Sequence, residues 1–277
     1  MTTTFRFNPV VPDVRLAPYV SKMWVFESSG RLPALDRKLI VPNANFKLTL
    51  TCRNGLVARI GDTTFVQEEN ELSLSGLIDT PVNLDPQEDV PTGTIIIEFN
   101  ALGVYRLFRL RYSEVKNQIV LLSDLFGSSV KGLQEQLANS DTPEMKVQVL
   151  QGFLIGRLEK ESADVIYDYC IRRIDDSRGA VTVAQLEKET GYSARWLHQK
   201  FLERLGTGPK NLAEIVRFKQ FYQAYSSGVI GERLKEHIYH YYYDQSHFLR
   251  AFKRFTGSTP TDLQNGMNDL ANLHYTS

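Results

Sequence analysis

The chain has 277 residues, of which 42% are hydrophobic and 11% aromatic, and its formal net charge is zero. This length suffices for two domains that each bury a core without disulfides. No apolar run approaches the roughly 20 residues of a membrane helix, and the start "MTTTFRFNPVVPDVR" lacks a basic segment followed by an apolar one. We therefore expect a cytoplasmic protein with no membrane partner, in which Cys52 and Cys170 are buried small hydrophobes.

Short runs rich in β-branched and aromatic residues follow one another from residue 19 to residue 99, separated by Gly, Pro, Asn and Asp. Such runs predict β-strands. The expected strands are "YVSKMWVF" (19–26), "NFKLTLTC" (45–52), "LVARI" (56–60), "TTFVQ" (63–67), "ELSLSG" (71–76) and "TIIIEF" (94–99). Several short strands at this spacing predict a compact sandwich or barrel.

After residue 99 the hydrophobic period changes from strand to helix. A short helix is expected in "LGVYRLFRL" (102–110), and longer helices over 128–138 and 143–161. In the last of these, an apolar stripe runs along one face: Val147, Leu150, Leu154 and Leu158. Because such a stripe needs a partner or a domain surface, we expect the helices at 128–161 to support a homodimer.

From about residue 164 every segment has a helical pattern. The first helix carries two neighbouring stripes that we expect to face the core: Val165 with Tyr169, and Ile166 with Cys170 and Ile174. This helix should stop at Gly179.

The next helix begins after Thr182, with Val183 and Leu186 directed inward. A turn at Gly191 and a cap at Ser193 then lead to a helix over about 194–204. Helix, glycine turn and helix form a helix-turn-helix unit, whose second helix enters the major groove of DNA.

This unit is repeated in the chain. Phe201, Gly206 and Pro209 recur as Phe252, Gly257 and Pro260, displaced by 51 residues. Between the copies, a rigid connecting helix is expected, with its apolar positions directed at both units: Leu212, Ile215, Val216, Phe218, Phe221 and Tyr222. One chain can then present two recognition helices to successive major-groove segments, about 34 Å apart.

The repeated residues resemble the DNA-binding domain of the AraC/XylS family of bacterial transcription regulators. The similarity covers about 164–265 and is strongest in "DQSHFLRAFKRFTGSTP" (244–260) and "GYSARWLHQKFLERLGTGPK" (191–210). Upstream, "PYVSKMW" and "FNALGVYRLF" look like the sensing or dimerising domain of such regulators. In one departure, the second turn has Tyr241 or Tyr242 where the family has glycine, or lacks one residue, so we expect this turn to be perturbed.

The resemblance implies an α+β multidomain protein. Residues 1–163 would form a strand-rich, barrel-like or sandwich-like regulatory and dimerisation domain with flanking helices. Residues 164–277 would form an all-α domain with one helix-turn-helix unit at about 164–208, a connecting helix at about 209–227, and a second unit at about 230–265. The implied function is sequence-specific binding of double-stranded DNA to regulate transcription. A small-molecule effector and RNA polymerase are further partners that this function implies.

The first recognition helix has a polar face. Leu197 and Phe201 are four residues apart and must point inward, so Arg195, His198 and Gln199 lie on the opposite side. By position, these three match the base-contacting residues of the family. Arg can bind guanine and Gln can bind adenine, each through two hydrogen bonds. The alternative for these three residues is a solvated helix face.

The second recognition helix follows the same logic. Phe248 and Phe252 point inward, and Gln245, Ser246 and Arg250 match the second base-reading set of the family. The altered turn makes this second set less regular.

Four cations on the same two helices suit DNA phosphates: Lys200, Arg204, Lys253 and Arg254. Residues 164–265 hold 15 Lys and Arg against 12 Asp and Glu, whereas residues 1–163 hold 17 against 19. The basic excess therefore lies with the repeat. Neutralising about six phosphates would give a slope of log affinity against log salt near −5.

Enzyme chemistry is not expected. His237, His240 and His247 lie near one another, but no carboxylate or cysteine completes a metal site, so no metal or other cofactor is predicted. All five histidines lie at residue 198 or later, so a metal centre in the strand-rich domain would have no imidazole ligand. Two cysteines cannot supply the four-cysteine zinc site of DNA-repair methyl transfer.

Two alternatives stay open from sequence. In the strand-rich domain, five aromatic residues either line a ligand cavity or form the core: Trp24, Phe26, Phe46, Phe65 and Phe99. If no ligand binds, that domain has a dimerisation role alone. For the whole chain, the alternative function is a protein-interaction scaffold that retains the helical fold without binding DNA.

Overall fold

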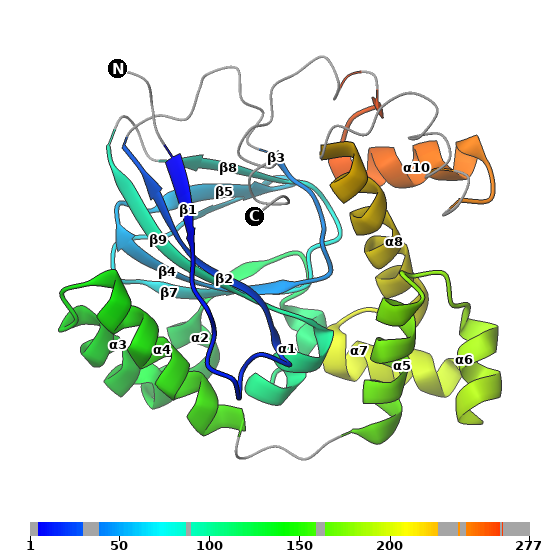
Figure 1. The fold of residues 1–277 in the computed structure, drawn as a ribbon, viewed down its shortest axis with the longest axis horizontal. Helices are drawn as coiled ribbons and strands as arrows, with labels where there is room; N and C mark the ends of the chain where they lie inside the picture. The colour runs from blue at the N-terminus through cyan, green and yellow to red at the C-terminus, as the bar shows by residue number, and fades with distance from the viewer. Residues whose placement is uncertain are drawn as a thin grey trace.

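The computed structural model describes residues 5–29, 39–86, 90–158, 164–226, 238, 242–260 and 262. Figure 1 shows a strand-rich part, residues 5–158, beside a helical part, residues 164–262. The predicted domain boundary adjoins residues 159–163, which lie outside the described residues, and it stays a prediction.

All six strands expected from sequence are present. They are β2 (Val20–Ser28), β4 (Phe46–Arg53), β5 (Leu56–Ile60), β6 (Thr63–Val66), β7 (Leu72–Ser75) and β9 (Thr92–Phe99). Four further strands were not predicted: β1 (Phe5–Pro9), β3 (Leu39–Ile40), β8 (Val82–Pro86) and β10 (Ile119–Leu121). They are short, or they contain Pro, Asn or Asp, which are depleted in strands.

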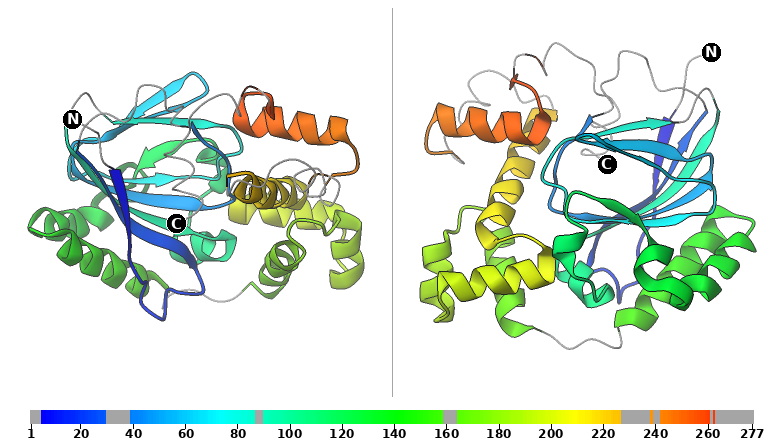
Figure 2. Two further views of the ribbon diagram at one scale, coloured as in Figure 1. Left: turned by 45° about the horizontal axis from the view of Figure 1, so that its top comes forward. Right: turned by 180° about the vertical axis from the view of Figure 1, so that it is seen from behind.

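The strands form two antiparallel sheets that face each other and are not closed into one barrel (Figures 1 and 2). One sheet has the order β1-β2-β9-β4-β7-β10 and the other has the order β3-β8-β5-β6. Glu98 on β9 is paired in register with Lys22 on β2 and with Lys47 on β4. Directly opposite residues in neighbouring strands share one face of a sheet, so these three charged side chains lie in one row.

Helices cover the outside of the larger sheet. They are α1 (Ala101–Leu107), α2 (Leu122–Phe126), α3 (Lys131–Ala138) and α4 (Pro143–Leu158). In α4 the predicted stripe is covered by this chain itself, because Val147, Leu150 and Leu154 are buried and Leu158 is half-buried. The stripe therefore gives no support to a dimer. The predicted homodimer stays a prediction.

The helical part contains α5 (Val165–Asp176), α6 (Val183–Thr190), α7 (Ala194–Leu205), α8 (Pro209–Ser226) and α10 (Gln245–Thr256). One predicted stripe of α5 is wrong, since Val165 is 72% exposed and Tyr169 is 39% exposed. Besides Cys170 and Ile174, the core face of α5 carries Tyr167 and Ile171. The buried face of α5 is therefore rotated by part of a turn from the predicted one. The ring of Tyr167 lies on it and packs on Phe201 of α7, with ring centroids 5.1 Å apart.

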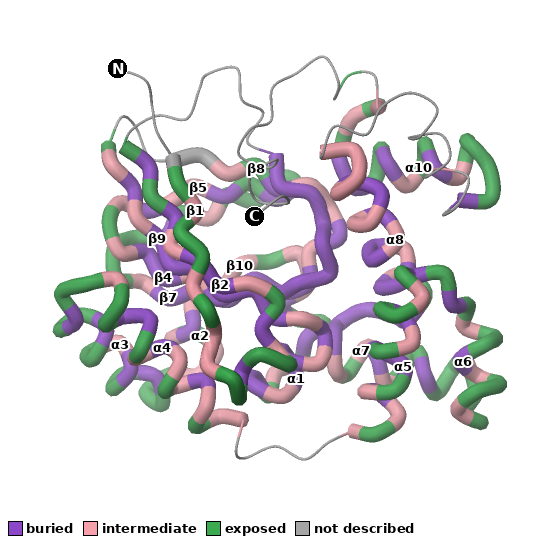
Figure 3. The backbone as a smooth tube through the Cα atoms, viewed as in Figure 1, coloured by how far each residue is buried: buried purple, intermediate pink, exposed green. Residues whose placement is uncertain are grey.

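Helix α8 connects the two halves of the helical part. All six apolar residues predicted to face both units are buried. Figure 3 shows the buried stretches along α8. Phe218 contacts Phe252 and Phe255 of α10, with ring centroids 5.9 and 4.9 Å apart. Phe221 contacts Phe248 of α10 at 4.7 Å. These contacts pack α10 against the C-terminal half of α8, while α7 lies toward the N-terminal end of α8 (Figure 1).

The strand-rich and helical parts touch where α1 meets α5. The Tyr105 hydroxyl donates to Asp168 Oδ1 at 2.9 Å and accepts the Asp164 backbone N–H at 2.9 Å. Arg106 donates to Asp168 Oδ2 at 2.7 Å. The rings of Tyr105 and Tyr167 pack edge to face at 4.9 Å. Burial raises the pKa of Tyr105 to about 12, so its hydroxyl keeps the proton that it donates.

Candidate functional site

The two recognition helices begin and end with matching caps. Ser193 Oγ accepts the Trp196 N–H at 3.3 Å, and Asp244 Oδ1 accepts the His247 N–H at 2.7 Å. Each helix ends at a left-handed glycine, with φ of 75° at Gly206 and 72° at Gly257. Both caps and both glycines are separated by the 51 residues of the sequence repeat. The displaced sequence pattern is thus also a displaced backbone structure.

The turn before each recognition helix follows the same displacement. In the first unit, Gly191 has a φ of 75° and its N–H donates to Glu187 O at 2.8 Å. In the second unit, the Tyr242 N–H donates to Ile238 O at 2.8 Å. Tyr242 therefore occupies the position of the glycine, 51 residues later, and no residue is deleted. Tyr241 lies outside the described residues.

The ring of Tyr242 is buried. It lies 5.3 Å from the ring of Phe248 and 5.4 Å from the ring of His247. Only 5% of Tyr242 is exposed, whereas the neighbouring Tyr243 is 94% exposed. The second turn thus adds an aromatic ring to the core of its unit.

On α7, the predicted division into two faces is present. Leu197 and Phe201 are fully buried, and Arg195, His198 and Gln199 are exposed. Gln199 is also within reach of its own helix, since its Nε2 donates to Glu203 Oε1 at 3.3 Å. The polar face is accessible to a partner.

Two aromatic rings stand beside the polar face of α7. Trp196 is 37% exposed and stacks on Tyr192, with ring centroids 4.1 Å apart. The ammonium of Lys200 lies 5.4 Å from the Trp196 ring. Trp196 therefore lies at the edge of the helix, with part of its ring at the surface.

On α10, Phe248 and Phe252 are buried while Gln245, Ser246 and Arg250 are exposed. Their roles at base edges stay a prediction for both helices. The arrangement satisfies the first requirement of that role, because all six side chains are accessible.

Two of the predicted phosphate contacts are engaged with a carboxylate. Lys200 Nζ lies 2.7 Å from Asp164 Oδ2, and Arg204 Nη2 lies 3.3 Å from the same oxygen. The guanidinium of Arg204 also lies 5.2 Å from the ring of Tyr105. Burial alone would raise the pKa of Asp164, but the Lys200 hydrogen bond, the Tyr167 N–H and the two cations lower it below its usual value.

Arg254 is engaged with residues of both parts. Its Nη2 donates to Asp79 Oδ2 at 3.0 Å and to Asn211 Oδ1 at 2.6 Å, and its Nη1 donates to Glu214 Oε2 at 3.2 Å. Lys253 is exposed. Sequence reasoning missed Asp79, because it precedes Arg254 by 175 residues and no local pattern joins them.

A crevice of about 440 Å³ brings candidate DNA contacts from both units together. His198 of α7 and Arg254 of α10 line it, as does Lys116 of the strand-rich part. Gly208 also lines this crevice, and a Cβ at this glycine would collide with the His198 imidazole. Gly208 thus gives His198 room at the start of α8.

A metal centre was not predicted. In the part of the chain that the structure describes, no three His, Cys, Asp or Glu side chains are grouped as metal ligands would be. His247 is half-buried against the Tyr242 ring, and His237 and His240 lie outside the described residues. Cys170 is buried and Cys52 is half-buried. Burial raises the pKa of the Cys170 thiol to about 11, so it is a poor nucleophile at neutral pH.

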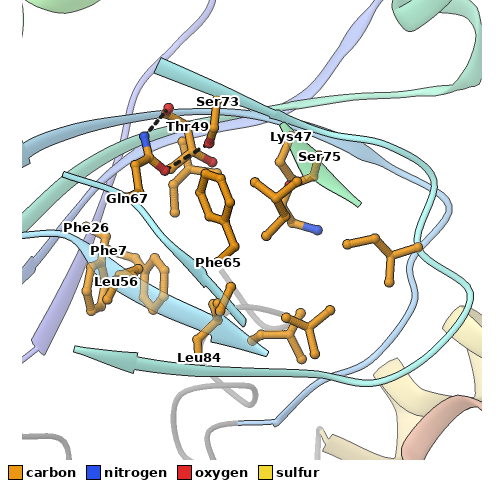
Figure 4. Close-up of a pocket in the computed structure, with 16 residues that line it drawn as sticks. Phe7, Phe26, Lys47, Thr49, Leu56, Phe65, Gln67, Ser73, Ser75 and Leu84 are labelled. Atoms are coloured by element: carbon orange, nitrogen blue, oxygen red, sulfur yellow. Dashed lines mark hydrogen bonds between the residues drawn. The ribbon is translucent and has the colours of Figure 1, made fainter. Parts of the chain in front are cut away.

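The strand-rich part contains an apolar cavity between its two sheets (Figure 4). Its free volume is about 90 Å³, which is room for roughly six water-sized spheres. Each of the ten strands β1 to β10 contributes at least one lining residue. Because drug-sized ligands usually occupy about 300–1,000 Å³, a ligand much larger than this volume requires the walls to move.

Polar groups are few in this cavity and lie mainly on β4 and β7. Gln67 Nε2 donates to Thr49 O at 2.9 Å, and Ser73 Oγ donates to Gln67 Oε1 at 2.9 Å. Lys47 lines the cavity and its Nζ lies 3.2 Å from Glu98 Oε1. Such a set can orient a small, mainly apolar molecule through a few hydrogen bonds.

The buried Glu98 carboxylate is also bound by two amides. Asn43 Nδ2 lies 3.1 and 3.2 Å from its two oxygens, and Asn45 Nδ2 donates to Oε2 at 2.8 Å. With Lys47 beside it, this buried charge is both paired and hydrogen-bonded.

The five aromatic residues considered for this cavity have different roles. Phe26 and Phe65 line it, as Figure 4 shows. Trp24, Phe46 and Phe99 are buried elsewhere in the core. Sequence alternation could not separate the two groups, because strands such as β4 are covered on both faces.

Two family models match separate ranges of the chain. A family model described as a helix-turn-helix domain matches residues 186–266. A second model, described as a domain of unknown function (DUF6597), matches residues 8–121. No curated protein matches the chain.

The chain can also be aligned with several solved structures. ToxT from Vibrio cholerae O395, bound to (E)-4-(8-methylnaphthalen-1-yl)but-3-enoic acid, is 14% identical with a TM-score of 0.48, covering 94% of this chain and 98% of ToxT. Unsaturated fatty acid bound wild-type ToxT from strain SCE256 is 13% identical with a TM-score of 0.47, covering 90% and 97%. The AraC-like transcriptional activator CuxR is 17% identical with a TM-score of 0.28, covering 82% and 88%. At such identities and scores, these likenesses carry no information on what this chain binds.

Proposed function

We propose that the protein is a transcription regulator of the AraC/XylS family that binds specific DNA sequences, because residues 186–266 match a helix-turn-helix family model. The observation that carries this proposal is the pair of recognition helices with matched caps, matched glycine ends and exposed polar faces. A chain built in this way reads two segments of one duplex.

The connecting helix α8 packs against both recognition helices, α7 and α10. Helix α8 has 18 residues, and at 1.5 Å per residue it is about 27 Å long. Because α10 also contacts Asn211 and Glu214 near the start of α8, the two recognition helices lie closer together than the full length of α8. We propose that α7 and α10 enter successive major grooves on one side of the duplex.

We assign base recognition to the six exposed polar residues of the two helices: Arg195, His198, Gln199, Gln245, Ser246 and Arg250. Lys200, Arg204, Lys253 and Arg254 are assigned to phosphates. Arginine and glutamine can each make paired hydrogen bonds to a base, worth about 1–3 kcal/mol of discrimination.

The test is selection of bound sequences from a random duplex pool, followed by affinity measurements at several salt concentrations. Arg195→Ala should lower the preference for the selected sequence by about 5- to 150-fold, the equivalent of about 1–3 kcal/mol. Arg172→Ala is the matched control, because Arg172 is exposed on α5 of the same helical part. A pool without enrichment, and variants that bind like wild type, would favour the protein-interaction scaffold.

We further propose that the strand-rich part binds a small-molecule effector in the cavity between its sheets. A ligand at 100 times its Kd should raise the free energy of unfolding by about 2.7 kcal/mol. Ala58→Leu places extra carbons in the cavity and is the control, since Ala58 lines it and is 4% exposed. If no mainly apolar metabolite raises the Tm of wild type more than that of Ala58→Leu, the part has a dimerisation role instead.

Dimerisation, contact with RNA polymerase and a location in the cytoplasm of a bacterium complete the proposal. Among the described residues, no helix has the length and apolarity needed to cross a membrane. Sedimentation velocity over a range of protein concentrations distinguishes a homodimer from a monomer.

A further inference from the structure

One buried carboxylate joins the two parts of the molecule. The Asp79 side chain follows strand β7 and is 6% exposed. Within the strand-rich part, Lys116 Nζ lies 2.9 Å from its Oδ2, and Asn117 Nδ2 donates to its Oδ1 at 2.8 Å. From the helical part, Asn211 Nδ2 and Arg254 Nη2 each donate to Oδ2 at 3.0 Å.

Arg254 is held on this carboxylate in a way that opposes contact with DNA. Its guanidinium is bound to the carboxylates of Asp79 and Glu214 and to the Asn211 carbonyl oxygen. A phosphate approaching it would meet the two carboxylates, and like charges placed together are repelled. The docked arrangement therefore withholds one of the four cations assigned to phosphates.

We propose that Asp79 is a latch that holds the second recognition helix, α10, against the strand-rich part, so that Asp79 and DNA compete for Arg254. This inference rests on the proposed function. It adds a specific contact through which the strand-rich part restrains DNA binding.

The latch can open without leaving an unpaired charge in the interior. When Arg254 and Asn211 move away, Asp79 keeps the ammonium of Lys116 and the amide of Asn117. Arg254 keeps Glu214, which lies on α8 of its own part. Because each of these charged groups retains a partner, opening the latch leaves no buried charge unpaired, which lowers the cost of opening.

The latch is attached to the wall of the cavity. Asp79 directly follows Ile78, and Asn117 precedes Ile119 by two residues, and both isoleucines line the cavity. The two segments are tied together, because the Asn117 N–H donates to Leu77 O at 3.0 Å. A displacement of Ile78 is thus transmitted to the carboxylate through the adjoining peptide.

The test compares Asp79→Asn with Asp62→Asn in the full-length chain. Both substitutions change the net charge from zero to +1, but Asp62 is exposed in the turn between β5 and β6. Affinity is measured for a random-sequence duplex by fluorescence anisotropy at several salt concentrations. Asp79→Asn should bind about 5- to 10-fold tighter than Asp62→Asn, at the low end of typical coupling between sites. Its slope against log salt should steepen by about 0.9, for one added phosphate contact.

A second substitution identifies the group that is released. Adding Arg254→Ala should abolish the gain of Asp79→Asn, whereas the same change in wild type should have a smaller effect. If Asp79→Asn does not fold, as judged by circular dichroism, Asn211→Ala replaces it. That variant keeps the Asp79 charge and removes one contact to Asp79 and one to Arg254.

The outcomes separate the latch from the proposed function. If wild type binds DNA and Asp79→Asn binds no tighter than Asp62→Asn, the latch is wrong and the DNA-binding function stands. If no variant binds DNA, the proposed function fails, and the competition fails with it. Amide hydrogen exchange of residues 245–256 tests the latch independently of DNA binding, because loss of the latch in Asp79→Asn should speed exchange in α10. Unchanged exchange in Asp79→Asn also overturns the latch.

Discussion

Replacing Tyr242 by glycine tests how the second helix-turn-helix unit tolerates a tyrosine at the position of Gly191. The glycine would match the first unit, but it removes a ring that packs on Phe248 and is 5% exposed. The Tyr242 hydroxyl makes no hydrogen bond within the described residues. Tyr242→Gly therefore raises the free energy of unfolding by removing this hydroxyl, and lowers it by removing the packing of the ring.

The two contributions can be measured separately. Tyr242→Phe removes the hydroxyl alone and should raise the free energy of unfolding by about 1 kcal/mol. Removing the ring as well should cost about 3–5 kcal/mol, as for other buried aromatic residues. Tyr242→Gly should therefore be less stable than wild type by about 2–4 kcal/mol.

Urea unfolding of the full chain, followed by far-ultraviolet circular dichroism, measures these differences. The matched control is Tyr243→Gly, which adds the same backbone freedom at a residue that is 94% exposed. If Tyr242→Gly loses no more stability than Tyr243→Gly, the ring contributes nothing and our account of the second turn is wrong.

Three further predictions concern the helix cap at Thr182, the stability in acid that depends on Asp164, and the reactivity of the Cys170 thiol. Thr182→Ala removes half of the capping box of α6 and should lower the free energy of unfolding by about 1 kcal/mol, while Thr182→Ser should retain it. The pKa of Asp164 is lowered, so its contribution to stability is complete above the ordinary carboxyl value near 4 and is lost as pH falls through the lower, folded value. Asp164→Asn should flatten the loss of stability in acid, and an unchanged acid profile would contradict this. Cys170, with a pKa of about 11, should resist a thiol reagent at pH 8 until urea unfolds the chain, and rapid native labelling would refute its burial.

The repeat was predictable because its signals are local. Thr182 and Ser193 as caps, and Gly191 as a left-handed turn, are determined by residues a few positions away. The period of α8 also identified its buried face, since contact with two units covers a broad stripe of the helix.

The features that sequence did not reveal depend on distant residues. The first helix of the unit was misread at Val165, because the packing of Tyr167 on Phe201 decides which face of α5 is inward. Asp79 and Arg254 come together only through the docking of the two parts. The cavity could not be foreseen because it takes one side chain or two from each strand, and no single strand carries a pattern that marks it.

Residues from every strand of both sheets line the cavity, so a bound molecule would contact both sheets. A molecule held there would stiffen the whole sandwich together rather than one hairpin. Amide protons should then become slower to exchange in both sheets at once. Amide exchange would slow in strands as far apart in the chain as β1 and β10 when the same molecule binds. The strand-rich part would therefore respond to binding as a single unit.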